Sequence, residues 1–250
     1  GALRHMAQNH ISQLLTLVAM EPPVTFDASA IRYEKIKVLR SIAPIGEEDV
    51  VRARYSPGVI DGEPVRGYLE EERVDQASNI ETFVALKVGV NNWRWKGVPF
   101  YLRTGKRMPR RLSQIAVRFQ DVPVRLFQKM GVPVSNTDVL VIELQPEEGF
   151  RLFFDVKAPG KPFSLQRVPL SFRYDQAFNR IPDAYQTLLL DVLTGDQTLF
   201  VHSDEVEESW RVFGALLDDP APLANYPAGT WGPKQADHLA LPEGLTWLDA

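Results

Sequence analysis

The sequence predicts an α+β fold in which helices flank a large, mostly antiparallel β-sheet. Two observations lead to this prediction. Segments rich in strand-forming residues follow one another through the middle of the chain, and helical periodicity occurs at both ends instead of alternating with the strands. The expected strands cover residues 51–55, 81–90, 98–104, 114–119, 139–144, 150–156 and 168–174.

Two helices are expected before the first strand. The first places one histidine in an apolar stripe at helical spacing, which reads Leu3, Met6, His10, Leu14 and Leu17. It should end before Pro22, because consecutive prolines cannot donate backbone hydrogen bonds. The second should begin near Asp27 or Ser29, either of which can cap it, and stop near Pro44.

Two further helices are expected after the last strand. One begins at Pro182 and Asp183, where a proline in the first turn and a carboxylate suit the positive helix end. The other begins after Ser203, and the tail from Asn225 is expected to lie on the surface. The whole chain, 1–250, is thus predicted to be one domain, with a helical lead-in over 1–45 and a β+α domain over 46–250.

Composition excludes several classes of protein. The chain has 28 Lys and Arg against 32 Asp and Glu, a formal net charge of -4, which argues against a nucleic-acid binder. It has no cysteine, which fits a cytoplasmic protein and leaves no thiolate metal ligand. The longest nearly unbroken apolar run, residues 14–20, is too short to cross a bilayer. The four histidines are not spaced as a metal pair, so no metal is expected.

A cationic turn follows the third expected strand. Residues 97–108 read Gly-Val-Pro-Phe-Tyr-Leu-Arg-Thr-Gly-Lys-Arg-Met, and Arg110 and Arg111 follow. Gly105 favours a close approach of backbone and ligand, Lys106 supplies a point charge, and Arg111 can bind a phosphate with two parallel hydrogen bonds. The turn therefore predicts a site for a small phosphorylated metabolite; the alternative is a solvated basic face.

His10 has two interpretations. On position alone, it is a buried histidine that donates to a backbone carbonyl. In the alternative it is a general base, because imidazole titrates near neutral pH and can take a proton from a sugar hydroxyl. No residue within one helical turn of His10 is acidic, so an orienting carboxylate would be remote. No glycine-rich nucleotide loop occurs in the chain, so nucleotide chemistry would come from outside it.

Taken together, these features resemble the C-terminal part of the glucose-6-phosphate dehydrogenase family. The similarity extends over nearly the whole chain in the family's order. It includes Arg4-His-Met-Ala-Gln-Asn-His10, Glu81-Thr-Phe-Val-Ala-Leu86, Asn92-Trp-Arg-Trp95, residues 97–107, Pro182-Asp-Ala-Tyr185, Gly195-Asp-Gln-Thr-Leu-Phe200 and Pro227-Ala-Gly-Thr-Trp-Gly-Pro233.

The resemblance implies an oxidoreductase of the pentose phosphate pathway. The family oxidises glucose 6-phosphate at C1 with NADP, and some members also with NAD, giving 6-phosphogluconolactone. By this resemblance His10 is the catalytic base, Lys106 and Arg111 contact the substrate, and the sheet forms a homodimer or a dimer of dimers. The family's coenzyme-binding domain lies upstream and is missing here, so this chain alone is expected to be inactive.

One departure from the family concerns substrate binding. His5 stands where the family usually has an aspartate that contacts the sugar. A histidine cannot accept two hydroxyl hydrogen bonds as a carboxylate does. This leaves two alternatives to the enzyme: a non-catalytic paralogue that acts as a dimerisation or regulatory partner, and an ordinary binding module. An intact set of His10, Lys106 and Arg111 favours the enzyme.

Overall fold

A computed structural model describes most of the chain. The described residues are 1–121, 124, 137–160, 164–179, 181–218, 221–239 and 246–248. The chain divides into two compact units. Unit 1 combines Gly1–Arg110 with Leu188–Ala250, and unit 2 is Arg111–Thr187. The helices of residues 1–45 belong to the same unit as the strands that follow them, while the predicted division at residue 45 stays a prediction.

The helices of unit 1 begin with a π-helix. This helix, η1, covers Leu3–Ile11 and continues directly into α1, Ser12–Ala19. Helix α2, Ala28–Ser41, begins after Asp27, whose carboxylate accepts hydrogen bonds from the backbone N–H groups of Ser29 and Ala30. Of the two capping residues that the sequence offers, Asp27 and Ser29, Asp27 is therefore the one that caps the helix.

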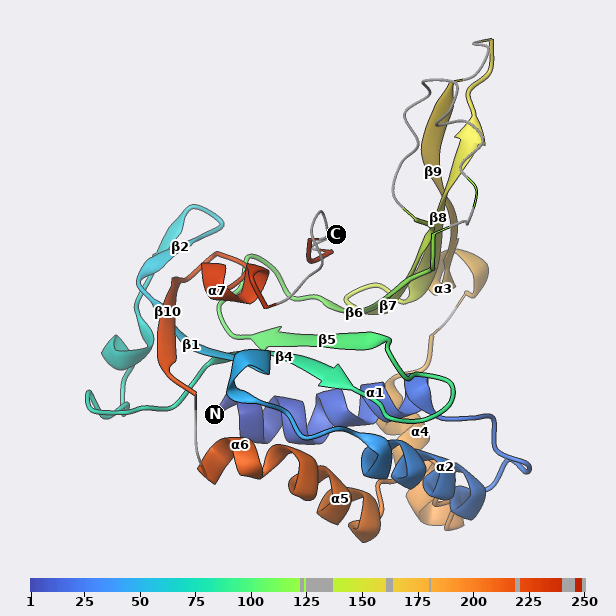
Figure 1. Cartoon of the computed structure of the whole chain (residues 1–250), viewed down its shortest axis with the longest axis horizontal. Helices are drawn as coiled ribbons and strands as arrows, with labels where there is room; N and C mark the ends of the chain where they lie inside the picture. The colour runs from blue at the N-terminus through green and yellow to red at the C-terminus, as the bar shows by residue number, and fades with distance from the viewer. Residues whose placement is uncertain are drawn as a thin grey trace. The chain divides into compact units, whose positions relative to one another are not determined.

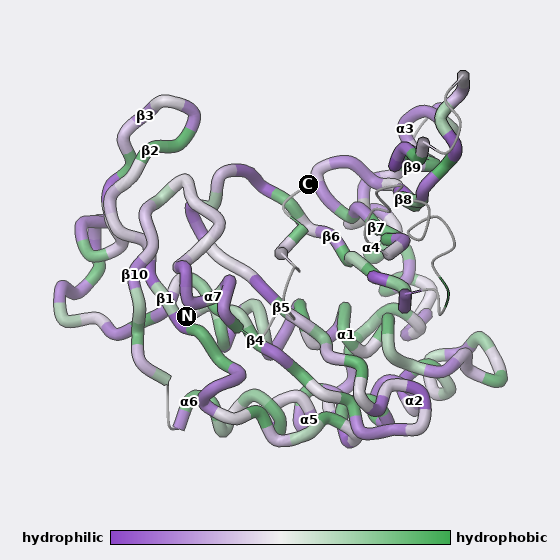
Figure 2. Tube along the Cα trace, turned by 45° about the horizontal axis from the view of Figure 1, so that its top comes forward, coloured by the Kyte–Doolittle hydropathy of each residue, from purple (hydrophilic) through white to green (hydrophobic). Residues whose placement is uncertain are grey.

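Helix α5, Ser203–Phe213, is the most regular amphipathic helix of the unit. Its buried residues recur at Glu205, Ser209, Val212 and Phe213, which is helical spacing, and hydrophobic and hydrophilic segments alternate along it in Figure 2. The shorter elements are α6, Ala215–Asp218; α7, Lys234–Asp237; and the 3₁₀ turns η2, Glu47–Asp49, and η3, Tyr68–Glu70. Figure 1 shows α1, α2, α5 and α6 on one side of β4 and β5, with α7 on the other.

The sheet of unit 1 has the strand order β10-β1-β4-β5. Its strands are β1, Val50–Ser56; β4, Phe83–Gly89; β5, Pro99–Gly105; and β10, Leu223–Pro227. Neighbours pair antiparallel except β1 and β10, which run parallel. Alternate residues of β4 enter two cores: Val84 and Leu86 face the helices, whereas Phe83 and Ala85 pack with Tyr226 on the opposite face.

A small hairpin follows β1. Strands β2, Gly58–Ile60, and β3, Glu63–Val65, pair antiparallel around Asp61 and Gly62. Both turn residues have positive φ, 51° and 84°, which is the backbone geometry that Asp-Gly pairs supply in two-residue hairpins. The Asp-Gly pair was thus a hairpin sign within residues 56–66.

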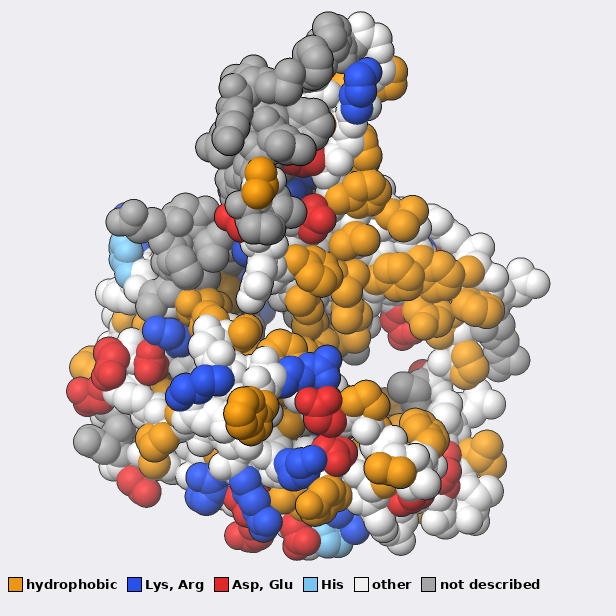
Figure 3. Space-filling view, turned by 45° about the vertical axis from the view of Figure 1, so that its right-hand side comes forward, with side chains coloured by type: hydrophobic (Ala, Val, Ile, Leu, Met, Phe, Trp, Pro, Cys, Tyr) orange, Lys and Arg blue, Asp and Glu red, His pale blue; other side chains and the backbone are white. Residues whose placement is uncertain are grey.

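Unit 2 contains an antiparallel sheet of order β6-β7-β8-β9. The strands are β6, Ser113–Arg118; β7, Val139–Gln145; β8, Gly149–Lys157; and β9, Leu165–Arg173, followed by α3, Tyr174–Ala177. Helix α4, Ala184–Thr194, begins in unit 2 and ends in unit 1, because the division falls between Thr187 and Leu188. The space-filling view shows hydrophobic side chains gathered on one face of the molecule (Figure 3). The exposed apolar side chains of unit 2 include those of Phe150, Leu170, Tyr174 and Phe178.

The predicted α+β class with mostly antiparallel strands is confirmed. The described strands are distributed over two four-stranded sheets and one hairpin instead of one large sheet. The expectation that the tail from Asn225 lies on the surface was wrong, because Asn225 to Pro227 belong to β10 and the Tyr226 side chain is fully buried.

Candidate functional site: a braced helix and a cationic turn

His10 lies on the exposed face of η1, not in its buried stripe. In a π-helix each residue turns the chain by less than in an α-helix, so the same face returns after four or five residues. Leu3, Ala7 and Ser12 follow this spacing and are buried. Met6, expected in the same stripe as His10, is also exposed. The buried-histidine interpretation is therefore wrong, and the imidazole is accessible.

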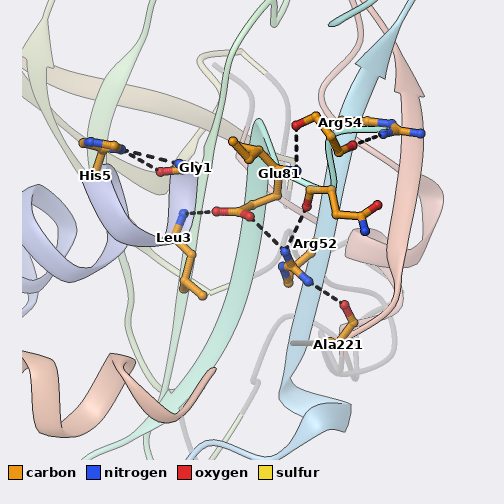
Figure 4. Close-up of polar contacts among 10 residues, drawn as sticks. Gly1, Leu3, His5, Arg52, Arg54, Glu81 and Ala221 are labelled. Carbon is orange, nitrogen blue, oxygen red and sulfur yellow. Dashed lines mark hydrogen bonds and ion pairs between the residues drawn. The ribbon is translucent and has the colours of Figure 1, made fainter. Parts of the chain in front are cut away.

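The beginning of η1 is held by Glu81. The Glu81 carboxylate accepts a hydrogen bond of 2.9 Å from the backbone N–H of Leu3, and its backbone carbonyl accepts one from Ala2. The same carboxylate pairs with Arg52 of β1 at 2.9 Å, and Arg52 donates in turn to the carbonyl of Ala221 (Figure 4). An acceptor at a helix N-terminus satisfies N–H groups that the helix leaves free.

Glu81 is ionised because of these contacts. Burial by itself would raise the pKa of Glu81, but the hydrogen bonds from Arg52 and from the Leu3 N–H outweigh it and hold this pKa below its ordinary value. A negative charge at the start of η1 also suits the positive end of the helix dipole. The arrangement fixes where η1 begins relative to β1 and β4.

The next turn of η1 is held by Gln8. Its side-chain amide is buried and donates a hydrogen bond of 2.6 Å to the Ser209 hydroxyl on α5. The Ser12 hydroxyl donates to the backbone carbonyl of Asn9 at 2.9 Å. In the Gln8-Asn9-His10 sequence, Gln8 thus ties the helix to α5, the Asn9 carbonyl accepts a bond from within the helix, and His10 presents its side chain outward. Among the residues that the structure describes, none hydrogen-bonds the His10 imidazole.

The Lys106 turn follows β5, as the sequence predicts. The backbone N–H of Lys106 donates to the Thr82 carbonyl at 2.9 Å, and its carbonyl accepts from the Tyr226 hydroxyl at 2.5 Å. Gly105 is required here, because a Cβ atom would lie 2.7 Å from the Phe83 ring and 2.9 Å from the Met108 sulfur. The Lys106 side chain is exposed, and within the described ranges its ammonium has no hydrogen bond or ion pair.

Arg107, the next residue, holds the turn from the other side. Its φ is 53°, its guanidinium pairs with Glu71 at 3.0 Å, and its backbone carbonyl accepts from the N–H of Gly229. Glu71 also accepts from the Tyr55 hydroxyl at 3.1 Å, and together the two hydrogen bonds lower the Glu71 pKa. Glu71 neutralises the charge of Arg107, whereas the ammonium of Lys106 is available to a ligand.

Arg111 and His5 occupy less constrained positions. Arg111 is the first residue of unit 2, is exposed, and donates to the Gln145 side chain at 3.0 Å. His5 is exposed on η1, and its Nδ1 lies 3.2 Å from the Gly1 carbonyl (Figure 4). The structure thus places His5, His10 and Lys106 in unit 1.

The C-terminal domain of glucose-6-phosphate dehydrogenase is the family whose model matches this sequence, over residues 1–248. This chain belongs to that family. It is 48% identical to glucose-6-phosphate 1-dehydrogenase of Chlamydia pneumoniae, covering 99% of this chain and 50% of that protein. It is 47% identical to the Rhizobium meliloti enzyme, covering 100% of this chain and 52% of the other.

Solved structures of glucose-6-phosphate dehydrogenases share the fold. One from Mycobacterium avium matches with a TM-score of 0.85 at 33% identity, over 100% of this chain and 51% of that chain. Another, in complex with its substrate glucose-6-phosphate, matches with a TM-score of 0.88 at 34% identity, over 99% of this chain and 51% of that chain. The chain therefore spans about half the length of the relatives it matches.

Several residues that support the site in this glucose-6-phosphate dehydrogenase domain were not found from the sequence. Glu81 and Thr82, directly before β4, and Tyr226 of β10 brace η1 and the Lys106 turn from distant positions in the sequence. No local pattern marks such contacts, although the polar pair Glu81-Thr82 directly before the apolar run 83–86 is a usable sign for Glu81.

The described part of the chain offers neither a metal-ligand cluster nor a membrane-spanning helix. It contains no cluster of three or more histidine, cysteine or acidic side chains that could hold a metal ion. It also contains no helix that is both long and apolar enough to span a bilayer.

Proposed function

We propose that this chain is the substrate-binding part of an enzyme that oxidises glucose 6-phosphate at C1 to 6-phosphogluconolactone. The observation that supports this most directly is the placement of His10. It lies exposed and without a described partner on a helix that is held at both turns, in the same compact unit as the braced Lys106 turn. A relative solved with glucose 6-phosphate shares this fold over nearly the whole chain.

In the proposed reaction His10 is the general base. An imidazole nitrogen of His10 takes the proton of the C1 hydroxyl while the C1–H bond breaks and the C1–O bond becomes a carbonyl. NADP supplies the chemistry of accepting the hydride from C1. This chain has no glycine-rich dinucleotide loop, so the residues that hold NADP belong to the half that the relatives carry in addition.

Lys106, Arg111 and His5 bind the substrate in this proposal. The Lys106 ammonium is a point charge on a fixed backbone, which suits an anionic sugar phosphate. Arg111 is exposed, and its guanidinium can exchange the neutral Gln145 oxygen for a stronger, charge-assisted contact with phosphate. The Nδ1 of His5 already contacts the Gly1 carbonyl, so we propose that its Nε2 meets one sugar hydroxyl.

We further propose that the enzyme forms a homodimer, or a dimer of dimers, through unit 2. Phe150, Phe172, Tyr174 and Phe178 form a continuous aromatic row, with successive ring centroids 5.2, 5.1 and 5.7 Å apart. Phe150, Tyr174 and Phe178 in this row are each more than 40% exposed, as is the nearby Leu170. An exposed apolar surface of this kind usually marks an interface.

The assay that tests the activity uses a full-length protein in which this chain follows its coenzyme-binding half. NADP reduction with glucose 6-phosphate should be readily measured, whereas the chain alone should show none. Replacing His10 with alanine should lower kcat by about 10²–10⁴-fold with folding unchanged. His238→Ala, at another exposed histidine, is the matched control and should retain full activity.

The opposite outcome has a clear meaning. A folded full-length protein that does not reduce NADP with glucose 6-phosphate would support the non-catalytic paralogue instead. That alternative draws on His5, which replaces a carboxylate with a side chain that makes fewer sugar contacts. An active enzyme whose rate is insensitive to His10→Ala would refute the assigned base alone.

A further inference from the structure

A chain of hydrogen bonds runs through the core of unit 1 and ends at Lys106. The backbone N–H of Tyr55 donates to the Thr82 hydroxyl at 3.0 Å. The Thr82 hydroxyl lies 3.3 Å from the hydroxyl of Tyr226. The Tyr226 hydroxyl in turn lies 2.5 Å from the Lys106 carbonyl. Tyr55 of β1, Thr82 directly before β4 and Tyr226 of β10 thus connect the sheet to the turn.

The direction in which these hydrogen bonds donate follows from the number of protons that each group carries. The Lys106 carbonyl can only accept, so the single phenolic proton of Tyr226 is directed to it. The Thr82 oxygen already accepts from an N–H group, so its own proton is available for the oxygen of Tyr226. Every hydroxyl therefore accepts one hydrogen bond and donates one, which is the arrangement in which successive bonds strengthen each other.

The tyrosine at the centre of the chain cannot move to another position. Tyr226 is fully buried, and its ring packs against Phe83 at 5.4 Å and Tyr55 at 6.5 Å between centroids. Burial, the largest effect, raises the pKa of Tyr226 to about 12, although the hydrogen bond with Thr82 opposes it. The phenol therefore keeps its proton throughout the neutral range and donates to Lys106 continuously.

We propose that Tyr226 and Thr82 are positioning residues for substrate binding, acting through the backbone of Lys106. This inference depends on the proposed function, in which the Lys106 ammonium contacts the sugar phosphate. The backbone carbonyl of Thr82 accepts from the Lys106 N–H, and the Tyr226 hydroxyl donates to the Lys106 carbonyl. Both backbone groups of Lys106 are therefore fixed. Ordering a flexible segment when the ligand binds costs entropy. A lysine whose backbone is already held loses less entropy on binding, because only its side chain has to be ordered.

Glu81 and Thr82 give this brace a second consequence. Glu81 holds the start of the helix that carries His10. Thr82 holds the turn that carries Lys106. Two consecutive residues at the entrance of β4 therefore set the separation between the proposed base and the proposed substrate cation.

The test measures KM for glucose 6-phosphate and kcat in the full-length enzyme. Tyr226→Phe keeps the ring and removes only the hydroxyl, and it should raise KM about three- to tenfold with kcat unchanged. Thr82→Val should also raise KM, whereas Thr82→Ser, which restores the hydroxyl, should return it to the wild-type value. The threonine pair keeps the test decisive if Tyr226→Phe fails to fold.

A double-mutant cycle separates positioning from general destabilisation. In a Lys106→Met background, which lacks the ammonium, adding Tyr226→Phe should leave KM where Lys106→Met alone puts it. The same rise in KM in both backgrounds would overturn the inference. Ser56→Ala is the matched control, because Ser56 donates to the backbone carbonyl of Tyr226 outside the hydroxyl chain; its KM should equal that of the wild type.

Different results would contradict the proposed function and the positioning role of Tyr226 and Thr82. A wild-type enzyme that does not oxidise glucose 6-phosphate would remove the proposed function itself. An active enzyme in which Lys106→Met raises KM but Tyr226→Phe and Thr82→Val do not would leave that function standing and overturn the positioning role.

Discussion

At the scale of single residues, the site combines free side chains with fixed backbones. The ammonium of Lys106 and the imidazole of His10 have no described partner, while the backbones that carry them are held by Thr82, Tyr226 and Glu81. A group that is free to meet a ligand and yet held in place loses little entropy when the ligand binds. This is the usual design of a preorganised binding site.

The tight packing at Gly105 leads to a first prediction. Gly105→Ala should destabilise the protein by about 1–3 kcal/mol, because the new Cβ would lie 2.7 Å from the ring of Phe83. Phe83 is fully buried and cannot give way. Urea unfolding gives the free energy of unfolding for the variant and the wild type.

Gly89 provides the control for this substitution. It lies on β4, beside the strand of Gly105, and a Cβ atom there would meet only the Ala43 side chain, at 3.9 Å. Gly89→Ala should therefore leave stability nearly unchanged. Equal losses from Gly105→Ala and Gly89→Ala would show that backbone conformation, and not the space beside Phe83, governs both positions.

At the scale of elements, η1 is the part of the molecule that depends most on distant residues. Its first turn is held by Glu81 at the start of β4 and its second by Ser209 of α5. A π-helix rarely extends beyond one turn and is found mostly where function requires it. External contacts at both turns explain how nine residues of this geometry persist here.

The ionised Glu81 predicts a pH-dependent stability. Its pKa is lowered in the folded state, so its contribution is fully present above the ordinary value of 4.5 and is lost as pH falls through the lowered pKa. Glu81→Gln leaves Arg52 buried without its partner and should cost about 3–5 kcal/mol at neutral pH. Urea unfolding at several pH values should show this difference shrinking below pH 4.5.

Glu34 supplies the comparison for that experiment. Glu34 pairs with the half-exposed Lys37 on α2, so Glu34→Gln should cost only about 0–1 kcal/mol. A Glu81→Gln effect that is equally small, or that persists unchanged in acid, would contradict the capping role of the carboxylate.

Sequence patterns predicted these elements unevenly. Strands such as β4 and β8 were predicted within a few residues, because their apolar runs are long and bounded by turns. The prediction of the buried face of η1 was wrong, because periodicity analysis assumes the rotation per residue of an α-helix. That rotation places His10 on the buried face. Strand β10 was missed because its five residues include Asn225 and Pro227, and only pairing with β1 makes them a strand.

At the scale of the whole molecule, the proposed oligomer predicts a separation of roles between the two units. Leu170→Glu places a charge in the exposed apolar surface of unit 2 and should convert the dimer to a monomer. Analytical ultracentrifugation of the full-length protein measures this directly. The matched change in unit 1 is Val24→Glu, at a residue that is 99% exposed, and it should leave the dimer intact.

The candidate residues were found from short segments, but their arrangement was not. His10 and Lys106 stand out because each lies in a distinctive local sequence. Their braces do not, because Glu81 and Tyr226 act across 78 and 120 positions of the chain. Contacts between residues so far apart in the sequence depend on the assembled sheet, and a single sequence carries no period or spacing that reports them.

The parallel pairing of β1 with β10 has a consequence for how the protein is made. The Ser56 hydroxyl of β1 donates to the Tyr226 carbonyl of β10, 170 positions away, and the whole of unit 2 is encoded between them. A ribosome adding about 5–20 residues per second needs roughly 10–30 s to cover that distance. Throughout this delay β1 presents an unpaired edge, the kind of surface that recruits strands from other molecules. Nascent chains that stall inside unit 2 should therefore be the ones that aggregate.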